Sequence, residues 1–165
     1  MAEDVVDEFA ATQPQLTKGS DQSLQFGEEL VGFKVNDIEP IWQSGGRAQL
    51  KSFCSALSDS LKKPFVEGRP RSEFFTVQVE GHTDNVPCRG DQSCNWPISA
   101  GRAARFRILM GDPVLCPGGG DWSILPVGKA GTVPVEDVGA TRRIEVRLLP
   151  DYAAIIYALS ARSAD

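Results

Sequence analysis

The residues best suited to chemistry lie in two short segments, a polar loop and the helix start that follows it. The loop is GHTDNVP at residues 81–87, and the second segment is NWPISAGRA at residues 95–103. Because α/β folds build their sites on loops at strand ends, Asp84 and Arg102 could face each other across one pocket. This pair suits a zwitterionic ligand: Asp84 would bind the ammonium group, Arg102 would bind the carboxylate with its planar fork, and amides at the helix start would assist. The residues alone allow a second interpretation, an Asp84–Arg102 salt bridge that only fixes the loop.

His82 raises an enzymatic alternative, because a histidine beside a carboxylate can act as a general base. The chain has one histidine, no serine or cysteine in a recognisable nucleophile context, and no GxSxG or HExxH motif. The GGG at residues 118–120 lacks the Lys-Ser/Thr of a P-loop. A lone loop histidine is more often a hydrogen-bonding or packing residue, so we expect a protein that is not an enzyme and has no cofactor.

The four cysteines allow more than one interpretation. Cys54 falls in a helical apolar pattern and is interpreted as a small core hydrophobe. Cys88 and Cys94 flank a five-residue loop and could form a disulfide outside a reducing cytosol. A zinc site made by Cys88, Cys94, Cys116 and His82 is the alternative, but no CxxC pair supports it, and we predict no metal site.

Hydrophobic periodicity predicts the elements that position these residues. Apolar side chains at Leu50, Phe53, Leu57 and Leu61 recur at helical spacing. Alternation of apolar and polar residues predicts strands at residues 74–80 and 142–149. The expected order begins with one or two short strands in residues 24–33, with a hairpin as one option, then a helix from about residue 46 to Pro64, a loop at residues 66–72 and a strand at residues 74–80. A helix from Asn95 to about Met110, a short strand at residues 122–127, a brief helical turn at residues 135–140 and a strand at residues 142–149 follow. Residues 151–165 either extend this last strand or add a small terminal helix. This order predicts an α/β sandwich with helices on one face of a mixed sheet.

One glycine stands inside the second predicted helix. Gly101 costs up to about 1 kcal/mol relative to alanine in a helix interior. We therefore expect something other than helix propensity to determine this residue.

Length, composition and charge are those of an ordinary globular domain. The chain has 165 residues, 41% of them hydrophobic and 24% charged, with a net charge of −5. Residues 1–40 carry nine acidic and two basic groups, which leaves 13 acidic and 15 basic groups in residues 41–165. Net acidity argues against nucleic acid as a partner, and the sequence has neither an 18-residue apolar run nor a secretory signal pattern. We expect a flexible acidic arm or linker end at residues 1–22, a domain at residues 23–150 and a C-terminal extension at residues 151–165.

Three motifs in order resemble the OmpA-like C-terminal domain, the module shared by OmpA, Pal-type lipoproteins and the MotB flagellar stator. They are VEGHTDNVP at residues 79–87, NWPISAGRA at residues 95–103 and TRRIEV at residues 141–146. The family patterns are a GHTD loop, an N-x-x-LS-x-x-RA helix start and an NRR-V-x-I strand. The resemblance covers about residues 28–150 and is most similar to the MotB branch. It implies a βαβαβ(α)β sandwich, with helices packed on one face of a mixed four-stranded sheet.

The resemblance implies non-covalent binding of peptidoglycan through the diaminopimelate of the stem peptide. Such binding would anchor a membrane protein or motor stator to the cell wall. On this implication Asp84 and Arg102 hold the amino-acid zwitterion. The other implied residues shape, line or brace the pocket: Thr83, Asn95, Ser99, Thr141, Arg142 and Arg143.

The resemblance also implies a periplasmic location in the cell envelope, near the outer membrane or a stator. Membrane attachment would come only through a tether that this sequence lacks, so we expect an excised domain. A second copy of the chain, in a homodimer, is a further expected partner. Thr141 stands where the family has asparagine, and Lys129-Ala130 stand in the family's Gly-Tyr-Gly element. The alternative is a degenerate OmpA-like domain that serves as a protein-interaction or dimerisation module without binding peptidoglycan.

Overall fold

The computed structural model describes residues 23–84, 94–131 and 142–161, together with Asp7, Ala11, Thr17 and Lys18. Its elements are β1 (Thr17–Lys18), β2 (Leu24–Phe26), β3 (Val31–Phe33), β4 (Pro40–Trp42), α2 (Gly46–Leu61), β5 (Pro64–Val66), β6 (Arg69–Pro70), the 3-10 turn η2 (Arg71–Glu73), β7 (Phe75–His82), α3 (Asn95–Met110), the 3-10 turn η4 (Gly119–Asp121), β8 (Ile124–Ala130), β9 (Ile144–Pro150) and α4 (Tyr152–Ala161). No helix among the described residues is long and apolar enough to cross a membrane.

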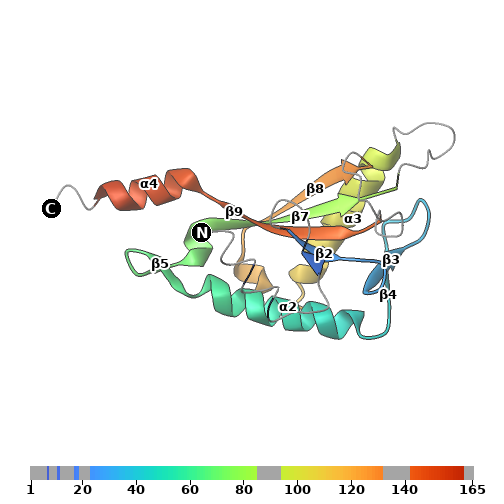
Figure 1. The fold of residues 1–165 in the computed structure, drawn as a ribbon, viewed down its shortest axis with the longest axis horizontal. Coiled ribbons are helices and arrows are strands. Elements are labelled where there is room, and N and C mark those ends of the chain that lie inside the picture. The colour runs from blue at the N-terminus through green and yellow to red at the C-terminus, as the bar shows by residue number, and fades with distance from the viewer. Residues whose placement is uncertain are drawn as a thin grey trace.

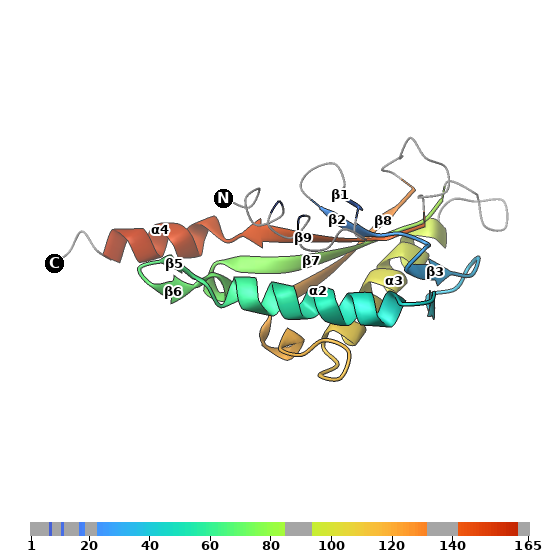
Figure 2. The same ribbon diagram turned by 60° about the horizontal axis from the view of Figure 1, so that its bottom comes forward.

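The central sheet is mixed and has the order β1-β2-β9-β7-β8. β7 and β8 are parallel, whereas β9 runs antiparallel to both β7 and β2. α2 and α3 lie on the same face of this sheet (Figure 2). The predicted α/β sandwich is therefore confirmed, with the two-residue β1, from the segment predicted as an acidic arm, added at the edge of the four-stranded sheet.

Alternation along β7 and β9 separates an apolar face of the sheet from a polar one. Val77 and Val79 of β7 lie opposite Leu148 and Val146 of β9, and Val77, Val79 and Val146 belong to the buried core. Each such side chain contributes about 1.5–3 kcal/mol when it leaves water. The alternate residues Gln78 and Glu80 of β7 lie on the other face of the sheet, away from the helices.

α2 presents the apolar stripe that the spacing predicts. Leu50, Phe53 and Leu57 are buried in the core, and the edge of the Phe53 ring packs on Phe26 of β2 with 5.2 Å between ring centroids. The helix ends at Leu61, before Pro64, as expected. The stripe therefore fixes α2 under the sheet (Figure 1).

Two glycines allow α3 to lie directly on the sheet next to the predicted site. A Cβ on Gly81 would be 2.1 Å from the Ser99 carbonyl oxygen, and one on Gly128 would be 2.7 Å from the Ala100 nitrogen. Both distances are shorter than any real Cβ contact, so only glycine fits at these positions. Gly101 is likewise explained by a neighbour, because its Cβ would lie 2.7 Å from a methyl carbon of Ile38.

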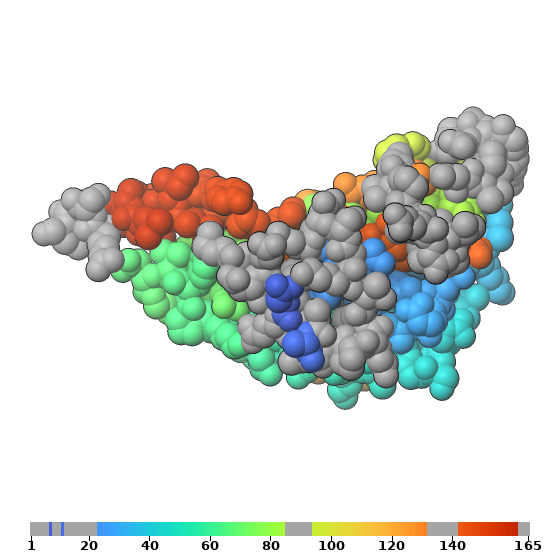
Figure 3. Space-filling model, in the orientation of Figure 1, coloured from blue at the N-terminus to red at the C-terminus, as the bar shows by residue number. Residues whose placement is uncertain are grey.

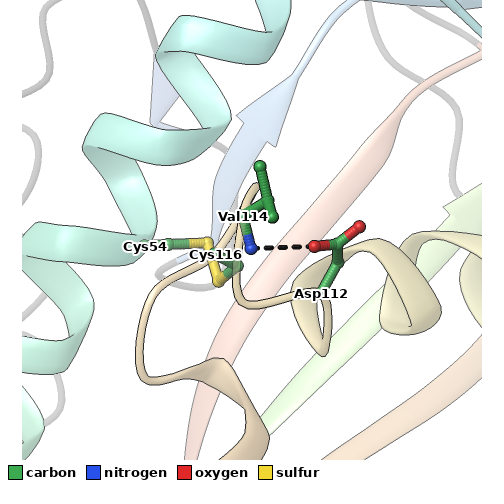
Figure 4. Close-up of a disulfide and its surroundings, with 4 residues drawn as sticks. All are labelled: Cys54, Asp112, Val114 and Cys116. Carbon is green, nitrogen blue, oxygen red and sulfur yellow. Dashed lines mark hydrogen bonds between the residues drawn. A yellow bond between two sulfur atoms is a disulfide. The ribbon is translucent and has the colours of Figure 1, made fainter.

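The interpretation of Cys54 as only a core hydrophobe is wrong. Cys54 is buried, but it forms a disulfide with Cys116, which lies in the connection after α3 (Figure 4). The amide of Val114 donates to Asp112 Oδ1 at 2.8 Å and shapes the same connection. The sequence pattern located the sulfur in the core, but it could not identify a partner 62 residues away.

Two local predictions also differ from the structure. β2 and β3 do not pair as a hairpin, since β2 pairs with β9 and β3 pairs with β4. The segment predicted as a loop at residues 66–72 instead contributes to a small β5–β6 hairpin followed by η2. The brief helical turn predicted at residues 135–140 lies outside the described residues.

Candidate functional site

Three segments that are distant in sequence meet at one end of the sheet. Asp84 follows β7, Arg142 precedes β9, and Glu28 follows β2. The start of α3 is held there as well, because the side-chain amide of Asn95 donates to the Asp84 carbonyl at 3.2 Å. The sheet order and the close contact of α3 with β7 therefore place the candidate site.

The accessible charges at this end form a small ion network. Arg142 Nε lies 2.8 Å from Glu28 Oε1 and 3.7 Å from Asp84 Oδ2. The side chain of Arg142 is 28% exposed and that of Asp84 is 32% exposed. A small charged molecule can therefore reach both groups, and the network is weak enough to be opened by a ligand.

Arg102, in contrast, is buried, with 2% of its surface exposed. Its guanidinium donates to the carbonyl oxygens of Asp37 at 3.0 Å, His82 at 3.3 Å and Lys34 at 3.1 Å. It also stacks over the ring of Phe33, 4.6 Å from the centroid. Arg102 thus ties the turn between β3 and β4 to the end of β7.

The charge of Arg102 persists at neutral pH. Burial is the main cause that lowers its pKa to about 10, and the nearby Arg142 adds to the effect, whereas Asp84 and Asp37 oppose it. Among the described residues, Asp84 pairs with Arg142 and not with Arg102, so the loop-fixing Asp84–Arg102 salt bridge does not form. The two groups still influence each other electrostatically.

The other predicted residues on α3 and β7 have mainly positioning contacts. Ser99 Oγ donates to the Trp96 carbonyl at 2.9 Å and accepts the amide of Ala130 at 3.0 Å, which joins α3 to the end of β8. The Thr83 amide donates to the Ala130 carbonyl at 3.1 Å. Its hydroxyl is buried and has no hydrogen-bond partner among the residues that the structure describes.

Arg143 belongs to a different group of charges, on the polar face of the sheet. Arg143 Nε lies 2.6 Å from Glu145 Oε1, and Glu145 faces Glu80 across the β7–β9 pair. Arg147 Nε lies 3.0 Å from Glu80 Oε1, and Arg147 Nη2 lies 3.1 Å from Glu145 Oε2. Glu80, His82, Arg143, Glu145 and the partly buried Arg147 form this cluster, and among the described residues no ion pair joins it to Asp84.

His82 lies inside this cluster and not in an open loop. It is fully buried, with Nε2 3.4 Å from Glu80 Oε2 and 3.6 Å from Glu145 Oε1. Burial alone would raise the pKa of Glu80, but the contact with His82 and the charges of Arg147 and Lys129 outweigh it and lower that pKa to about 2. The His82 side chain is therefore enclosed within this charged cluster and is not exposed to solvent.

The same cluster has the donor set of a metal site but the charge balance of an ion-pair network. The ligating atoms of Glu80, His82 and Glu145 all lie within 4.8 Å of one another. Arg143, Arg147 and the Lys129 ammonium, 3.7 Å from Glu80, already compensate the two carboxylates. A divalent cation would meet three cations there, so these residues do not fit a metal.

The cysteine and Thr141 predictions have mixed outcomes. The zinc interpretation that included Cys116 is wrong, because Cys116 is bonded to Cys54. Cys94 is disulfide-bonded, and Cys88, its predicted partner, lies outside the described residues, as does Thr141. The Cys88–Cys94 pairing and the role of Thr141 therefore stay predictions.

Sequence reasoning missed Glu28 and the main-chain acceptors of Arg102. Glu28 stands beside Glu29 after a short strand, with no motif to distinguish the two. The main-chain carbonyl groups of Lys34 and Asp37, which accept hydrogen bonds from Arg102, cannot be recognised from the side chains of these residues. Acceptors of this kind can be identified only from the path of the backbone.

Comparisons with solved structures agree with this architecture. No protein-family model matches the chain, and no curated protein matches it significantly. The cell wall anchor of the T6SS from Pseudomonas aeruginosa is similar at 19% identity over 88% of this chain and 97% of that chain, with a TM-score of 0.55. The periplasmic domain of Helicobacter pylori MotB (residues 97-256) is similar at 16% identity over 86% of this chain and 91% of that chain, with a TM-score of 0.54. A putative MotB-like protein from Desulfovibrio vulgaris is similar at 17% identity over 89% of this chain and 94% of that chain, with a TM-score of 0.50. The chain therefore has the OmpA-like fold that its three motifs predicted, and it shares that fold with MotB periplasmic domains.

Proposed function

We propose that this domain binds peptidoglycan non-covalently, at the end of the sheet where Asp84 and Arg142 meet, and so anchors a larger assembly to the cell wall. The observation that carries the proposal is the accessible carboxylate of Asp84, 3.7 Å from the Arg142 guanidinium, in the loop that ends β7. The two groups contact each other, and a zwitterion can take over this pairing, with its ammonium at Asp84 and its carboxylate at Arg142. The ligand group we propose is the free end of diaminopimelate in a stem peptide.

Charge balance supports a zwitterion over a simple anion or cation. Glu28 and Asp84 supply two negative charges at this end, and Arg142 and Arg102 supply two positive charges. A ligand with one ammonium and one carboxylate keeps the site neutral when it replaces the internal pairing. A ligand with only one of these groups would leave a charge without a partner.

The contacts assign different roles to the two arginines. Asp84 binds the ligand ammonium, and Arg142, which is accessible, binds the carboxylate. Three of the five N–H groups of Arg102 are directed at carbonyls. Arg102 therefore holds the β7 end in position and adds positive potential below the ligand carboxylate, while Asn95, Ser99 and Thr83 shape the surrounding backbone.

A location outside the cytosol is part of the same proposal. A buried disulfide between Cys54 and Cys116 is stable in an oxidising compartment such as the periplasm. The similar structures include a cell wall anchor and periplasmic domains. The protein we propose is a periplasmic wall-binding module without a catalytic role.

Co-sedimentation with purified sacculi tests the proposal. Asp84→Asn and Arg142→Gln should each lower wall binding at least about tenfold, which corresponds to about 1.4 kcal/mol for one charged contact. Arg69→Gln is the matched control, because Arg69 is an exposed arginine in an ion pair with Glu73 on the β5–β6 hairpin. Equal binding by the control and both site variants would overturn the proposal.

Competition and wall chemistry test the ligand. Free diaminopimelate should release the protein from sacculi. Walls whose stem peptide carries lysine should bind it weakly, because the lysine side chain offers an ammonium but no carboxylate to Arg142. Equal affinity for both wall types would contradict the zwitterion assignment while leaving wall binding itself intact.

A further inference from the structure

Glu28 contacts the accessible Arg142 more closely than Asp84 does. Glu28 Oε1 lies 2.8 Å from Arg142 Nε, whereas Asp84 Oδ2 lies 3.7 Å from the same nitrogen. The side chain of Glu28 is 36% exposed and that of Arg142 is 28% exposed, so a small ligand can reach both. A carboxylate that binds Arg142 at this nitrogen must therefore replace Glu28.

A tight turn after β2 fixes the backbone that carries Glu28. The amides of Leu30 and Val31 both donate to the Gly27 carbonyl at 3.0 Å, and Leu30 and Val31 belong to the buried core. The segment of residues 23–42, drawn in light blue, reaches the surface at the end of the molecule opposite α4 (Figure 3). Glu28 thus has a defined position at the candidate site.

The neighbouring Glu29 has the same charge but a different position. Its carboxylate lies against Gly27, so close that a Cβ on this glycine would clash with it. Among the described residues, Glu28 and not Glu29 forms the ion pair with Arg142. The turn therefore offers two adjacent glutamates, of which the structure pairs one with the site.

We propose that Glu28 determines the specificity of the site, because it lowers the affinity of Arg142 for any carboxylate that has no ammonium group beside it. This role rests on the proposed function, since it concerns which ligands the same end of the sheet accepts. A zwitterion that displaces Glu28 offers its own ammonium to the carboxylates of Glu28 and Asp84. A lone carboxylate displaces Glu28 and offers no positive charge in return, and it is repelled by both acidic groups.

The charge balance of the site explains this discrimination. The carboxylates of Glu28 and Asp84 are matched by Arg142 and by the buried Arg102, which keeps its charge at neutral pH. A zwitterion leaves this balance unchanged, whereas a lone carboxylate adds one negative charge without a partner. Without the charge of Glu28 the preference is reversed, because a lone carboxylate would then make the site neutral.

The same reasoning identifies the groups of a stem peptide that the site distinguishes. The free end of diaminopimelate carries an ammonium and a carboxylate on one carbon atom. The C-terminal carboxylate of a peptide has an amide nitrogen in place of the ammonium. We therefore expect Glu28 to direct Arg142 away from peptide C-termini and toward the diaminopimelate end. Because Glu28 and Arg142 are partly exposed, the discrimination should amount to about two- to fivefold, the range of exposed ion pairs.

NMR titration of the full chain tests this role, with sodium acetate as the lone carboxylate and meso-diaminopimelate as the zwitterion. Sodium chloride keeps the ionic strength constant, and the Nε–H signal of Arg142 is followed. Glu28→Gln should bind acetate about two- to fivefold more tightly than the wild type. Its affinity for diaminopimelate should change by less than about twofold, because the loss of a competitor for Arg142 and the loss of an attraction for the ammonium oppose each other.

Two further variants separate the charge of Glu28 from other effects of substitution. Glu28→Asp keeps the charge and should keep acetate binding as weak as in the wild type. Glu29→Gln is the matched control, because it removes the same charge from the adjacent position and should leave both affinities unchanged. Thermal unfolding of the three variants would show that the fold is intact.

Three results would overturn the proposal. Equal acetate affinity in Glu28→Gln and the wild type would show that Glu28 does not protect Arg142. An equal gain for acetate and diaminopimelate would make Glu28 a competitor of every carboxylate alike, and a loss for diaminopimelate beyond about twofold would make it a ligand of the ammonium. An equal gain in Glu29→Gln would assign the effect to the overall charge of the turn.

The acetate titration also separates this proposal from the proposed function. It contains no wall polymer, so it measures the effect of Glu28 on Arg142 whether or not the protein binds sacculi. Loss of wall binding in Asp84→Asn and Arg142→Gln, together with unchanged acetate affinity in Glu28→Gln, would support the proposed function and overturn the role of Glu28. Unchanged wall binding in the two site variants would overturn the proposed function alone.

Discussion

The disulfide between Cys54 and Cys116 should supply a large part of the folding stability. It joins the middle of α2 to the connection after α3, and both sulfur-bearing residues are buried. A cross-link mainly restricts the unfolded chain, and its effect grows with the length of the closed loop. For a separation of 62 residues, loop-closure entropy gives about 4 kcal/mol at 25 °C. Since such domains unfold with about 5–15 kcal/mol, removal of the bond should bring the protein close to its limit.

Urea unfolding of three forms measures this contribution: the oxidised wild type, the reduced wild type, and the variant Cys54→Ala/Cys116→Ala. The double variant leaves Cys94 unchanged, so it separates this bond from any other. We expect a loss of about 4 kcal/mol in the double variant, with slightly more from the removal of two buried sulfurs. The slope of unfolding free energy against urea should rise, because the unlinked unfolded chain exposes more surface.

Two results would refute the reasoning about the disulfide. A double variant within about 1 kcal/mol of the wild type would show that the unfolded chain is already compact around this loop. A reduced wild type that is as stable as the oxidised form, with all four cysteine thiols free by titration, would show the same without any mutation. Either result would also weaken the argument for an oxidising compartment.

Three further predictions concern the site and its supports. Arg102→Gln should lower the unfolding free energy by about 2–4 kcal/mol, because it leaves buried carbonyl groups without hydrogen-bond donors. Arg142→Gln should lower the unfolding free energy by less than about 1 kcal/mol, because its ion pairs are partly exposed. Urea unfolding measures both losses, and equal losses would contradict the proposed roles of the two arginines. Gly81→Ala should cost about 2–4 kcal/mol and abolish wall binding because α3 must shift, while Gly120→Ala, with open space around its Cβ, should change stability by less than about 0.5 kcal/mol. The pKa of Glu80 is about 2 in the folded protein against an ordinary 4.5, so the stabilisation that ionised Glu80 provides is complete above pH 4.5 and is lost as the pH falls toward 2. Glu80→Gln should therefore lower the unfolding free energy by about 1–2 kcal/mol at pH 7 and reduce the loss of stability between pH 4.5 and 2. An unchanged acid dependence in the variant would exclude Glu80 as its cause.

Strong periodicity made the main elements predictable. The helical row of Leu50, Phe53 and Leu57 and the alternation of Val77 and Val79 each leave one periodic pattern, and the structure has α2 and β7 there. Each pattern reflects only which face of a helix or strand is buried, and this can be inferred without knowing the residues packed against it. For this reason the α/β sandwich, with its helices on one face of the sheet, could be predicted from the sequence.

Short strands and long-range pairings left no such pattern. β3 and β4 have three residues each, too few for a period, so their pairing could not be distinguished from a β2–β3 hairpin. Four cysteines allow three pairings, and sequence distance does not select among them. These features are determined by where the backbone brings segments together.

The site shows the same division at the level of single side chains. The motif that contains Arg102 leads to the end of the sheet where Asp84 and Arg142 lie, because its guanidinium connects a strand end to the start of a helix. Its hydrogen bonds, however, are directed at the main chain of the β3–β4 turn and of His82. Arg142 has no such backbone partners in the described contacts and stands with Asp84 at the surface. We therefore propose that the buried Arg102 holds the backbone of the site and that the more accessible Arg142 exchanges partners with the ligand. Separate substitution of the two arginines would show which of them binds it.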